Sequence, residues 1–372
     1  MQADTLSTAE RLDRLRLCRT DNVGPVTYRR LIERFGSAAA AIDALPDLSR
    51  RGGRSRALVP PRRTAAEQEA EALVSRGGHL VFWGEAAYPV PLAAIEDAPP
   101  VLSVLGRGEL LHERVVAIVG ARNASANGCR FARGLAADLA DAGWIVVSGL
   151  ARGIDADGHQ GALKGGTVAV VAGGVDVIYP KENAELYDRI AERGAVVSEQ
   201  PLGTKPQARH FPPRNRIISG LALGVVVVEA AMRSGSLITA RLAGEQGREV
   251  FAVPGSPMDP RCRGTNGLIR QGATLTESAA DVLEALDGMV RPLVSGRLDD
   301  HMPTQPAWDE PAEADVASAR QAVHDKLGYS PIHVDELMRQ CQLSPALLSA
   351  ALLELELAGR LARHPGNQVS LR

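Results

Sequence analysis

The chain has 372 residues, of which 45% are hydrophobic and 23% are charged, and its formal net charge is -2. This composition excludes a fibrous or disordered chain, and the length predicts two or three domains. No apolar run approaches the roughly 18 residues of a spanning helix, and the first residues lack a signal-peptide core. We therefore expect a cytoplasmic protein with no membrane partner.

Cysteine usage and the choice of cations narrow the class of site. The four cysteines lie far apart and form no CxxC pair, so we expect neither a disulfide framework nor a thiolate zinc site. Only four of the 42 basic residues are lysines, and the planar fork of arginine suits phosphate and base stacking. A high-GC genome produces the same bias toward arginine, so the positions of the arginines must show whether they bind nucleic acid.

Residues 1–76 predict a small SAM-like domain of short helices. Within it, residues 22–37 contain a Gly-Pro turn between apolar stretches, as in helix-hairpin-helix modules. Such a turn can present backbone N–H groups to phosphate, or it can be a plain helix connection, and the sequence leaves both open. Residues 49–63 are rich in Gly, Pro and Arg and predict a loop.

Residues 77–289 predict an extended Rossmann-like α/β domain with a mostly parallel sheet. Six runs are apolar throughout and alternate with helical stretches, which is typical of parallel strands joined by right-handed crossovers. The Pro-rich stretch 83–106 is expected to pack on the edge of this sheet. The six runs occupy residues 115–120, 144–149, 167–174, 195–199, 224–230 and 249–255.

Residues 290–316 predict a linker because they hold several prolines and acidic residues. Residues 317–372 fit a winged helix, with Ser344 capping the second helix. That helix carries Glu354 and Glu356 and has no basic residue before Arg360. Helices that enter a major groove bring donors to phosphates and bases. The module is therefore interpreted as a protein contact rather than as a reader of duplex DNA.

The loops that follow the predicted strands are the candidate binding elements. In an open parallel sheet, ligands bind beyond the carboxyl ends of the strands, near the point where the strand order reverses. Three such loops combine small residues, an arginine and a helix start, which favours anions. Their candidate residues are Arg122, Arg152, Ser234, Gly235 and Ser236.

The connection before the fifth run places Phe211 among prolines and cations. An aromatic ring that stacks on a base while cations hold phosphates is the combination used for single strands. Alternatively, Phe211 fills a core, and Arg214 and Arg216 pair with acids such as Glu199 or Glu229. The candidate binding residues of this connection are Arg209, Phe211, Arg214, Asn215 and Arg216.

The common enzyme signatures are missing from the sequence. The strand that ends at Gly120 lacks GxGxxG, and the chain contains neither GxxxxGK[ST] nor GxSxG. Asp155 and Asp157 lie where a helix begins, where carboxylates favour the helix dipole, so capping is preferred over an acid pair. His159 is expected to pack or cap a helix. We therefore expect a non-catalytic protein without a metal or a cofactor.

Together these segments resemble the DprA/Smf family of DNA-processing proteins. The resemblance covers the α/β domain through motifs such as VAIVGARNAS, HFPPRNRIISG and RSGSLITARLAGEQ, and it extends more weakly to both end modules. It implies an extended Rossmann-like fold that binds single-stranded DNA without hydrolysing it. It also implies a homodimer that protects incoming strands during natural transformation and hands them to the RecA recombinase.

The resemblance also assigns residues. The family's phosphate-contacting arginine, its basic residue after Tyr-Pro and its stacking aromatic fall on Arg122, Lys181 and Phe211. Further motif positions fall on Arg214, Asn215, Arg216, Ser234, Gly235 and Ser236. Ala208 replaces a family lysine, and Lys205 and Arg209 are the candidates to compensate.

Two other functions compete with this interpretation. Rossmann-like nucleotide phosphoribohydrolases carry a Gly-rich turn and a glutamate after a similar strand, as VVVVEAAMRSGS does here, but their PGGxGTxxE motif is missing. Release of free base from nucleoside monophosphates would identify such an enzyme. The second is a scaffold that engages recombination proteins through its end modules, in which case the isolated α/β domain would retain no DNA.

Overall fold

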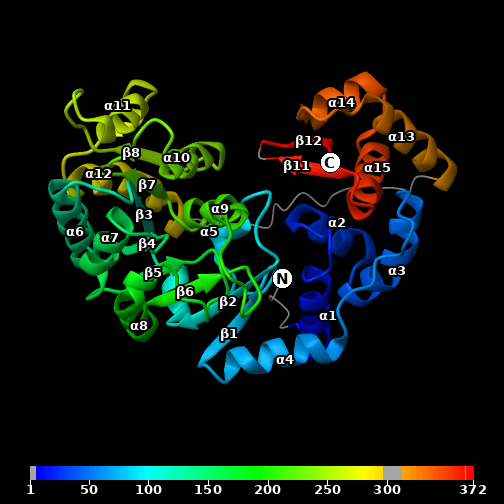
Figure 1. The fold of residues 1–372 in the computed structure, drawn as a ribbon, viewed down its shortest axis with the longest axis horizontal. Helices are drawn as coiled ribbons and strands as arrows, with labels where there is room; N and C mark the ends of the chain where they lie inside the picture. Colours follow the sequence, from blue (N-terminus) through cyan, green and yellow to red (C-terminus); the bar gives the residue numbers. More distant parts are fainter. Residues whose placement is uncertain (1–5, 296–311, 365) are drawn as a thin grey trace. The chain divides into compact units, whose positions relative to one another are not determined.

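The computed structural model describes residues 6–295, 312–364 and 366–372. These residues form two compact units (Figure 1). The first unit contains residues 68–295, and the second combines residues 6–67 with the described part of residues 312–372.

A nine-stranded sheet forms the centre of the first unit. Its strands are β1 (Gly78–Phe82), β2 (Val101–Gly106), β3 (Val115–Val119), β4 (Ile145–Ser148), β5 (Thr167–Val170), β6 (Ala195–Ser198), β7 (Gly224–Val227), β8 (Glu249–Ala252) and β9 (Thr274–Leu275). Their order across the sheet is β1-β2-β6-β5-β4-β3-β7-β8-β9. Strands β3 to β9 pair in parallel, whereas β2 joins β6 and β1 joins β2 antiparallel. The strand order reverses between β3 and β7.

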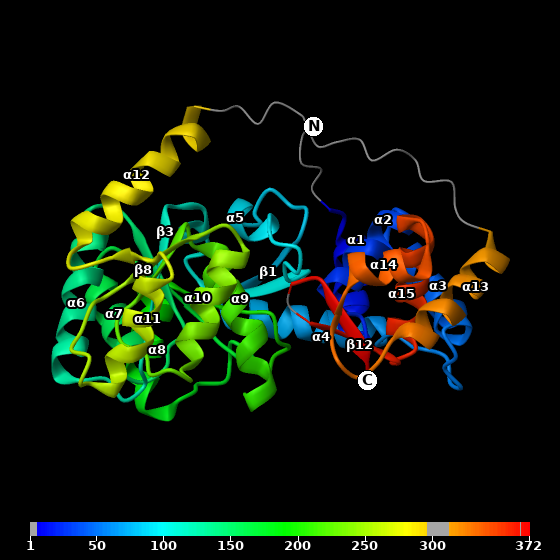
Figure 2. The same cartoon turned by 90° about the horizontal axis from the view of Figure 1, so that it is seen from above.

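Helices cover both faces of this sheet (Figures 1 and 2). The α-helices are α4 (Arg63–Val74), α5 (Val90–Ala93), α6 (Ala126–Asp141), α7 (Ile154–Ala162), α8 (Ala184–Arg193), α9 (Phe211–Leu221), α10 (Gly235–Glu245), α11 (Arg263–Arg270) and α12 (Ala279–Ser295). Short 3-10 helices are η1 (Gly108–His112), η2 (Lys181–Asn183), η3 (Ala208–His210) and η4 (Pro260–Cys262). Helices α6, α7 and α12 pack on one face, and α5, α9 and α10 pack on the other.

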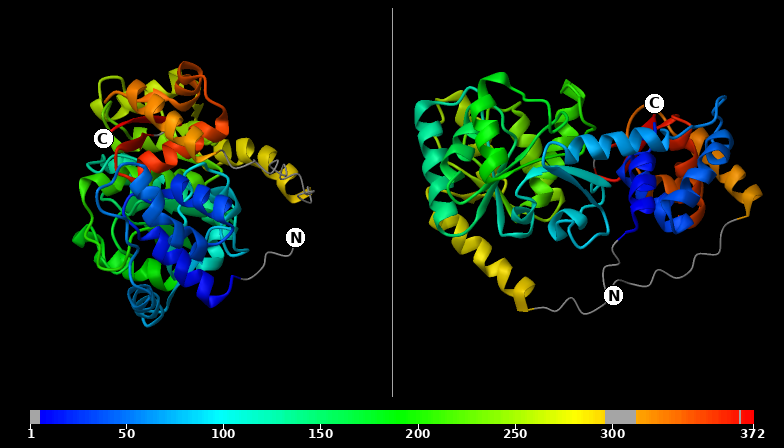
Figure 3. Two further views of the ribbon diagram at one scale, coloured as in Figure 1. Left: turned by 90° about the vertical axis from the view of Figure 1, so that its right-hand side faces the viewer. Right: turned by 90° about the horizontal axis from the view of Figure 1, so that it is seen from below.

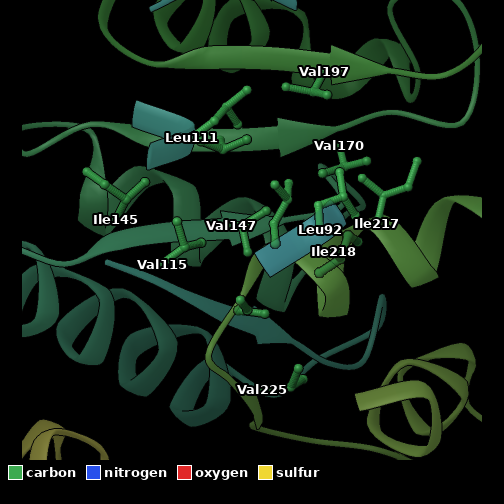
Figure 4. Close-up of a cluster of buried hydrophobic side chains, with 14 of the residues drawn as sticks. Leu92, Leu111, Val115, Ile145, Val147, Val170, Val197, Ile217, Ile218 and Val225 are labelled. Carbon is green, nitrogen blue, oxygen red and sulfur yellow. The ribbon is translucent and has the colours of Figure 1, made fainter. Parts of the chain in front are cut away.

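The core lies on both sides of the sheet because successive residues of a strand point to opposite faces. In β3, Val116 and Ile118 belong to the cluster beneath α6, while Val115, Ala117 and Val119 belong to the cluster beneath α9. Figure 4 shows the second cluster, in which valines of the central strands meet isoleucines of α9. Strands buried on both faces therefore read as unbroken apolar runs.

The second unit joins helices from both ends of the chain (Figure 3). Its elements are α1 (Thr8–Cys18), α2 (Pro25–Phe35), α3 (Ala38–Arg51), α13 (Glu313–Lys326), β10 (Ile332–His333), α14 (Val334–Cys341), α15 (Pro345–Leu357), β11 (Leu361–His364) and β12 (Gln368–Leu371). Ser344 caps α15, since its side chain accepts a hydrogen bond from the Leu347 N–H. The three short strands form a sheet in the order β10-β12-β11.

The predicted fold class is confirmed: the sheet is mostly parallel and carries a helical module before it and a winged helix after it. The six predicted runs form β3 to β8, and within stretch 83–106 strand β2 extends the sheet beside β6. Of the predicted linker, residues 296–311 lie outside the described residues, as does Pro365 of the wing turn. Within the described ranges, no helix combines the length and the apolar character needed to cross a bilayer.

Candidate functional site

The loops after β3, β4 and β5 meet at the carboxyl edge of the sheet and form a pocket. It encloses about 480 Å³, part of which is open solvent, and the start of α9 closes one side. Its lining includes Arg122, Gly149, Arg152, Tyr179, Phe211 and Arg214. Four residues predicted from sequence, Arg122, Arg152, Phe211 and Arg214, are thus brought together in one place.

Gly153 allows two of these loops to approach each other closely. Its φ is +74°, and a Cβ atom there would lie 2.4 Å from the Ala121 carbonyl oxygen and 2.8 Å from that of Arg122. The Ile154 N–H, at the start of α7, donates to the Ala121 oxygen at 3.2 Å. Only glycine combines this backbone conformation with so little space. The loop after β4 therefore holds the backbone of Arg122 at the pocket.

Phe211 lies at the centre of the pocket's charged side chains. The Arg122 guanidinium carbon is 5.2 Å from the Phe211 ring centroid, and that of Arg214 is 5.6 Å from it. The ring of Tyr179 meets Phe211 edge-on, with centroids 6.0 Å apart. Both guanidiniums are within the distance at which a cation is attracted to an aromatic ring. The pocket thus offers aromatic surface and positive charge to one ligand.

Arg214 is a buried cation with unsatisfied hydrogen-bonding capacity. The residue is 6% exposed, and its Nε atom has no hydrogen-bond partner within the described part of the chain. Burial lowers its pKa to about 10, a shift that the nearby charge of Asp155 opposes and that of Arg122 reinforces. Two cations beside one pocket repel each other, and an anion placed between them relieves that repulsion.

The groups beneath Arg214 are Asp155 and His159, both in α7. Asp155 is buried and accepts a hydrogen bond from the Ala151 N–H at 3.2 Å. Burial raises the pKa of Asp155, and the charge of Arg214 opposes this rise. His159 is fully buried, with its Nδ1 2.8 Å from the Thr167 hydroxyl, and burial lowers its pKa to about 3. The packing role predicted for His159 is confirmed, and Asp155 supplies the local counter-charge.

Three further predicted cations lie on the surface around the pocket. Arg152 is exposed, and its Nη1 is 3.9 Å from Glu182 Oε1. Lys181 is exposed in η2, directly after the cis Tyr179–Pro180 peptide bond. Arg209 is exposed in η3. Their charges therefore face solvent, where a polyanion has access to them.

The predicted Ser-Gly-Ser turn forms the start of α10. Ser234 is the N-cap, and its hydroxyl is 2.7 Å from that of Ser236. Asn215 of α9 reaches this turn, with its Nδ2 3.5 Å from the Gly235 carbonyl oxygen. These four residues do not line the pocket; they connect α9 to the start of α10.

Arg216 lies in a different environment from the one expected of a DNA contact. The residue is 6% exposed, and its guanidinium pairs with Glu199 and, at 3.4 Å, with Asp97. Burial opposes its charge, but these two carboxylates outweigh burial and raise its pKa. The pairing with Glu199 is the alternative that the sequence had left open. With no exposed guanidinium, Arg216 acts within the fold.

A carboxylate fills the place where the strand order reverses. Glu229 follows β7, is 6% exposed, and accepts hydrogen bonds from the backbone N–H (2.9 Å) and the hydroxyl (2.5 Å) of Ser125 at the start of α6. In a dinucleotide-binding fold, this helix start holds the pyrophosphate. The expected site near the reversal point is therefore closed, and the pocket lies over β3, β4 and β5 instead. Both carboxylate oxygens of Glu229 therefore accept hydrogen bonds from Ser125.

Sequence reasoning missed three residues of the pocket region. Tyr179 precedes the basic residue of the Tyr-Pro motif, and an aromatic next to a motif position was the available signal. Gly149 gave no signal, although a Cβ there would lie 1.5 Å from Arg214 Nη1. Asp155 was noticed only as a helix cap. Among the described residues, no group of three or more His, Cys, Asp or Glu side chains is arranged to hold a metal ion.

Three segments of the chain match models of known protein families. Residues 79–287 match the model of DNA recombination-mediator protein A, residues 8–72 match the DprA-like N-terminal HHH domain, and residues 306–367 match the DprA winged helix domain. Protein Smf of Escherichia coli is 42% identical over 299 residues, which is 79% of this chain and 78% of that protein. DNA processing protein DprA of Bacillus subtilis is 50% identical over 202 residues, 54% of this chain and 68% of that protein.

Two solved structures share the fold. The X-ray structure of DprA from Streptococcus pneumoniae superimposes with a TM-score of 0.62 and 35% identity, and covers 75% of this chain and 98% of that one. The structure of DNA processing protein A from Helicobacter pylori, which concerns its single-stranded DNA binding mode, gives a TM-score of 0.51 and 29% identity over 54% of this chain and 94% of that one. The fold, the motifs and these relatives together show that the chain belongs to the DprA family of DNA recombination-mediator proteins.

Proposed function

We propose that this protein binds single-stranded DNA at the pocket around Phe211 and acts without catalysing a reaction. The observation that carries the proposal is the buried guanidinium of Arg214, whose Nε has no hydrogen-bond partner among the described residues and which shares an aromatic ring with the exposed Arg122. A desolvated cation next to a second cation favours an anion. The aromatic rings favour an unpaired base, whose face is accessible only outside a duplex.

The two arginines have different parts in this mechanism. Arg122 is exposed at the rim and meets a phosphate as the strand arrives, with release of counterions. Arg214 is fixed below it and anchors the phosphate that enters the pocket. Phe211 stacks a base, which contributes roughly 1–3 kcal/mol and carries little sequence preference.

The surrounding residues extend this site. Arg152, Lys181 and Arg209 are exposed cations and track neighbouring phosphates. In this proposal Arg209 and Lys205 replace the charge that is missing at Ala208. Asn215 and the turn Ser234, Gly235 and Ser236 set how α9 sits against α10, and Arg216 holds α9 to the acids beneath it.

The cellular role proposed here follows the family. The protein protects single strands in the cytoplasm during DNA uptake and recombination, works as a homodimer, and delivers the strand to RecA. The edge strand β9 supports a contact between copies, because it pairs only with β8 among the described strands and its Leu275 side chain is 47% exposed. Sedimentation of the protein alone tests the dimer, and co-purification with RecA tests the handover.

Salt-dependent titration of labelled oligonucleotide separates the two kinds of contact. Arg122→Ala is expected to weaken binding to every sequence and to lower the salt slope by about 0.7, the contribution of one phosphate on a single strand. Phe211→Ala is expected to cost about 1–3 kcal/mol with little change in slope. Arg241→Ala is the matched control, because Arg241 is an exposed arginine on α10 paired with Glu245. Titrations that match this control for both variants would refute the proposed site.

A further inference from the structure

Helix α15 of the winged module has apolar side chains on two of its sides. Leu348, Leu352 and Leu355 are buried in the core of their own module. Leu353 and Leu357 instead belong to the core formed by α1, α2 and α3. A helix that is apolar all round is a buried helix. Helix α15 therefore lies between two modules that come from opposite ends of the chain (Figures 1 and 3).

The backbones of these modules come into direct contact where α3 ends. A Cβ atom added at Gly52 would lie 2.0 Å from the Glu354 carbonyl oxygen and 2.8 Å from the Ala358 Cβ. Both neighbours belong to α15 or its C-cap, so neither is the flexible end of a side chain. Glycine is required at this position because α3 and α15 leave no room for a side chain between them.

Polar groups also cross this contact. Arg372, the last residue, donates from Nη1 to Asn22 Oδ1 at 2.7 Å. Glu356 of α15 lies beside the Gly-Pro turn, with its Oε1 3.7 Å from the position of a Cβ on Gly24. Helix α2 starts at this turn without an acidic residue or a side-chain cap of its own. Glu356, whose Oε2 pairs with Arg363 Nε at 2.8 Å, thus places its other carboxylate oxygen near the positive end of the α2 dipole.

We propose that α15 is a docking helix whose partner is the N-terminal helices of the same chain, and that it does not read duplex DNA. In helix-turn-helix proteins, the second helix enters the major groove through an exposed face with donors. Here that helix is buried by α3 on one side and has no cation before Arg360. The Gly24 turn faces a carboxylate, so it serves as a helix connection. The chain ends form one structural unit.

Hydrogen exchange on the full-length protein tests this docking. Gly52→Leu is expected to separate α3 from α15 and to speed amide exchange in both helices at least tenfold, and Gly52→Ala is expected to give a smaller change in the same direction. Gly328→Leu is the matched control, because its Cβ would meet only one atom, the Ser330 nitrogen, at 4.0 Å. Exchange in both Gly52 variants equal to that of Gly328→Leu would overturn the proposal.

Duplex DNA provides the second measurement, and it requires no variant. Addition of duplex DNA to the wild-type chain is expected to leave the exchange of α15 unchanged. Slower exchange confined to α15, together with faster exchange in α3, would show that the helix leaves its partner to read the duplex, and the docking role would be wrong. Because this measurement concerns the second unit alone, it is independent of binding at the Phe211 pocket.

Discussion

Replacement of Glu199 by glutamine tests whether Arg216 acts in the fold or on DNA. Glutamine keeps the shape of the Glu199 side chain but removes the negative charge that pairs with the guanidinium of Arg216, a residue that is 6% exposed. Breaking a buried pair costs about 3–5 kcal/mol, because the remaining charge is left without its partner. Asp97 stays within 3.4 Å of Arg216 but is half exposed, so we expect the lower end, about 3 kcal/mol.

Thermal unfolding measures the stability of the Glu199→Gln protein, and DNA titration measures whether its single-strand affinity changes. A loss of about 3 kcal/mol corresponds to a melting temperature lower by roughly 6–12 °C for a unit of this size. Below that temperature, single-strand affinity is expected to change by less than about twofold, since Arg216 is not among the cations proposed to hold phosphates. Asp141→Asn is the control: its 3.8 Å pair with Lys164 is exposed and is worth about 0–1 kcal/mol. A stable Glu199→Gln protein with weakened DNA binding would refute this reasoning.

Two further predictions concern Gly149, which lines the pocket, and His159, which lies beneath it. In Gly149→Ala the new Cβ would lie 1.5 Å from the present position of Arg214 Nη1, and we expect oligonucleotide binding to weaken roughly 10- to 100-fold because a charged hydrogen bond is lost. Gly134→Ala is the control, because a Cβ at Gly134 has nothing within 4 Å. Equal oligonucleotide affinities of the two variants would contradict the prediction. Burial holds the pKa of His159 near 3, so below about pH 6.5 the unfolded chain binds a proton that the folded chain refuses, and stability falls as the pH drops. Between pH 6.5 and 5 the free energy of unfolding is expected to fall by about 2 kcal/mol. This loss should be absent in His159→Gln. Denaturant titrations in which the wild type and His159→Gln lose stability equally over this pH range would contradict the prediction.

The sequence predicted those parts of the fold that depend on local pattern. Strands β3 to β8 are buried on both faces, and this burial makes them readable as unbroken apolar runs. Strands β1 and β2 were not predicted as strands: β2 lies in the stretch interrupted by prolines and is placed by pairing with β6, and β1 is placed by pairing with β2. The docking of α15 on α3 joins residues some 300 positions apart, a separation at which no local pattern specifies a contact.

The candidate site shows the same division between local and distant information. Arg122 was predicted from the loop after β3, and Phe211 and Arg214 from the motif before β7, and the structure brings all three to one pocket. The sequence could not predict that Arg214 faces the pocket while Arg216 pairs with Glu199, since the two residues lie only two positions apart in one helix. Their environments differ only because helix geometry turns Arg216 toward Glu199 and Arg214 toward Phe211.

Glu229 has a consequence for how this scaffold acquires new ligands. A carboxylate that satisfies the Ser125 end of α6 acts as a resident substitute for a nucleotide phosphate. A dinucleotide would have to break both hydrogen bonds between Ser125 and Glu229 before its pyrophosphate could bind at the start of α6. Binding of a dinucleotide at this helix start is therefore disfavoured relative to a fold in which the same N–H groups are unoccupied.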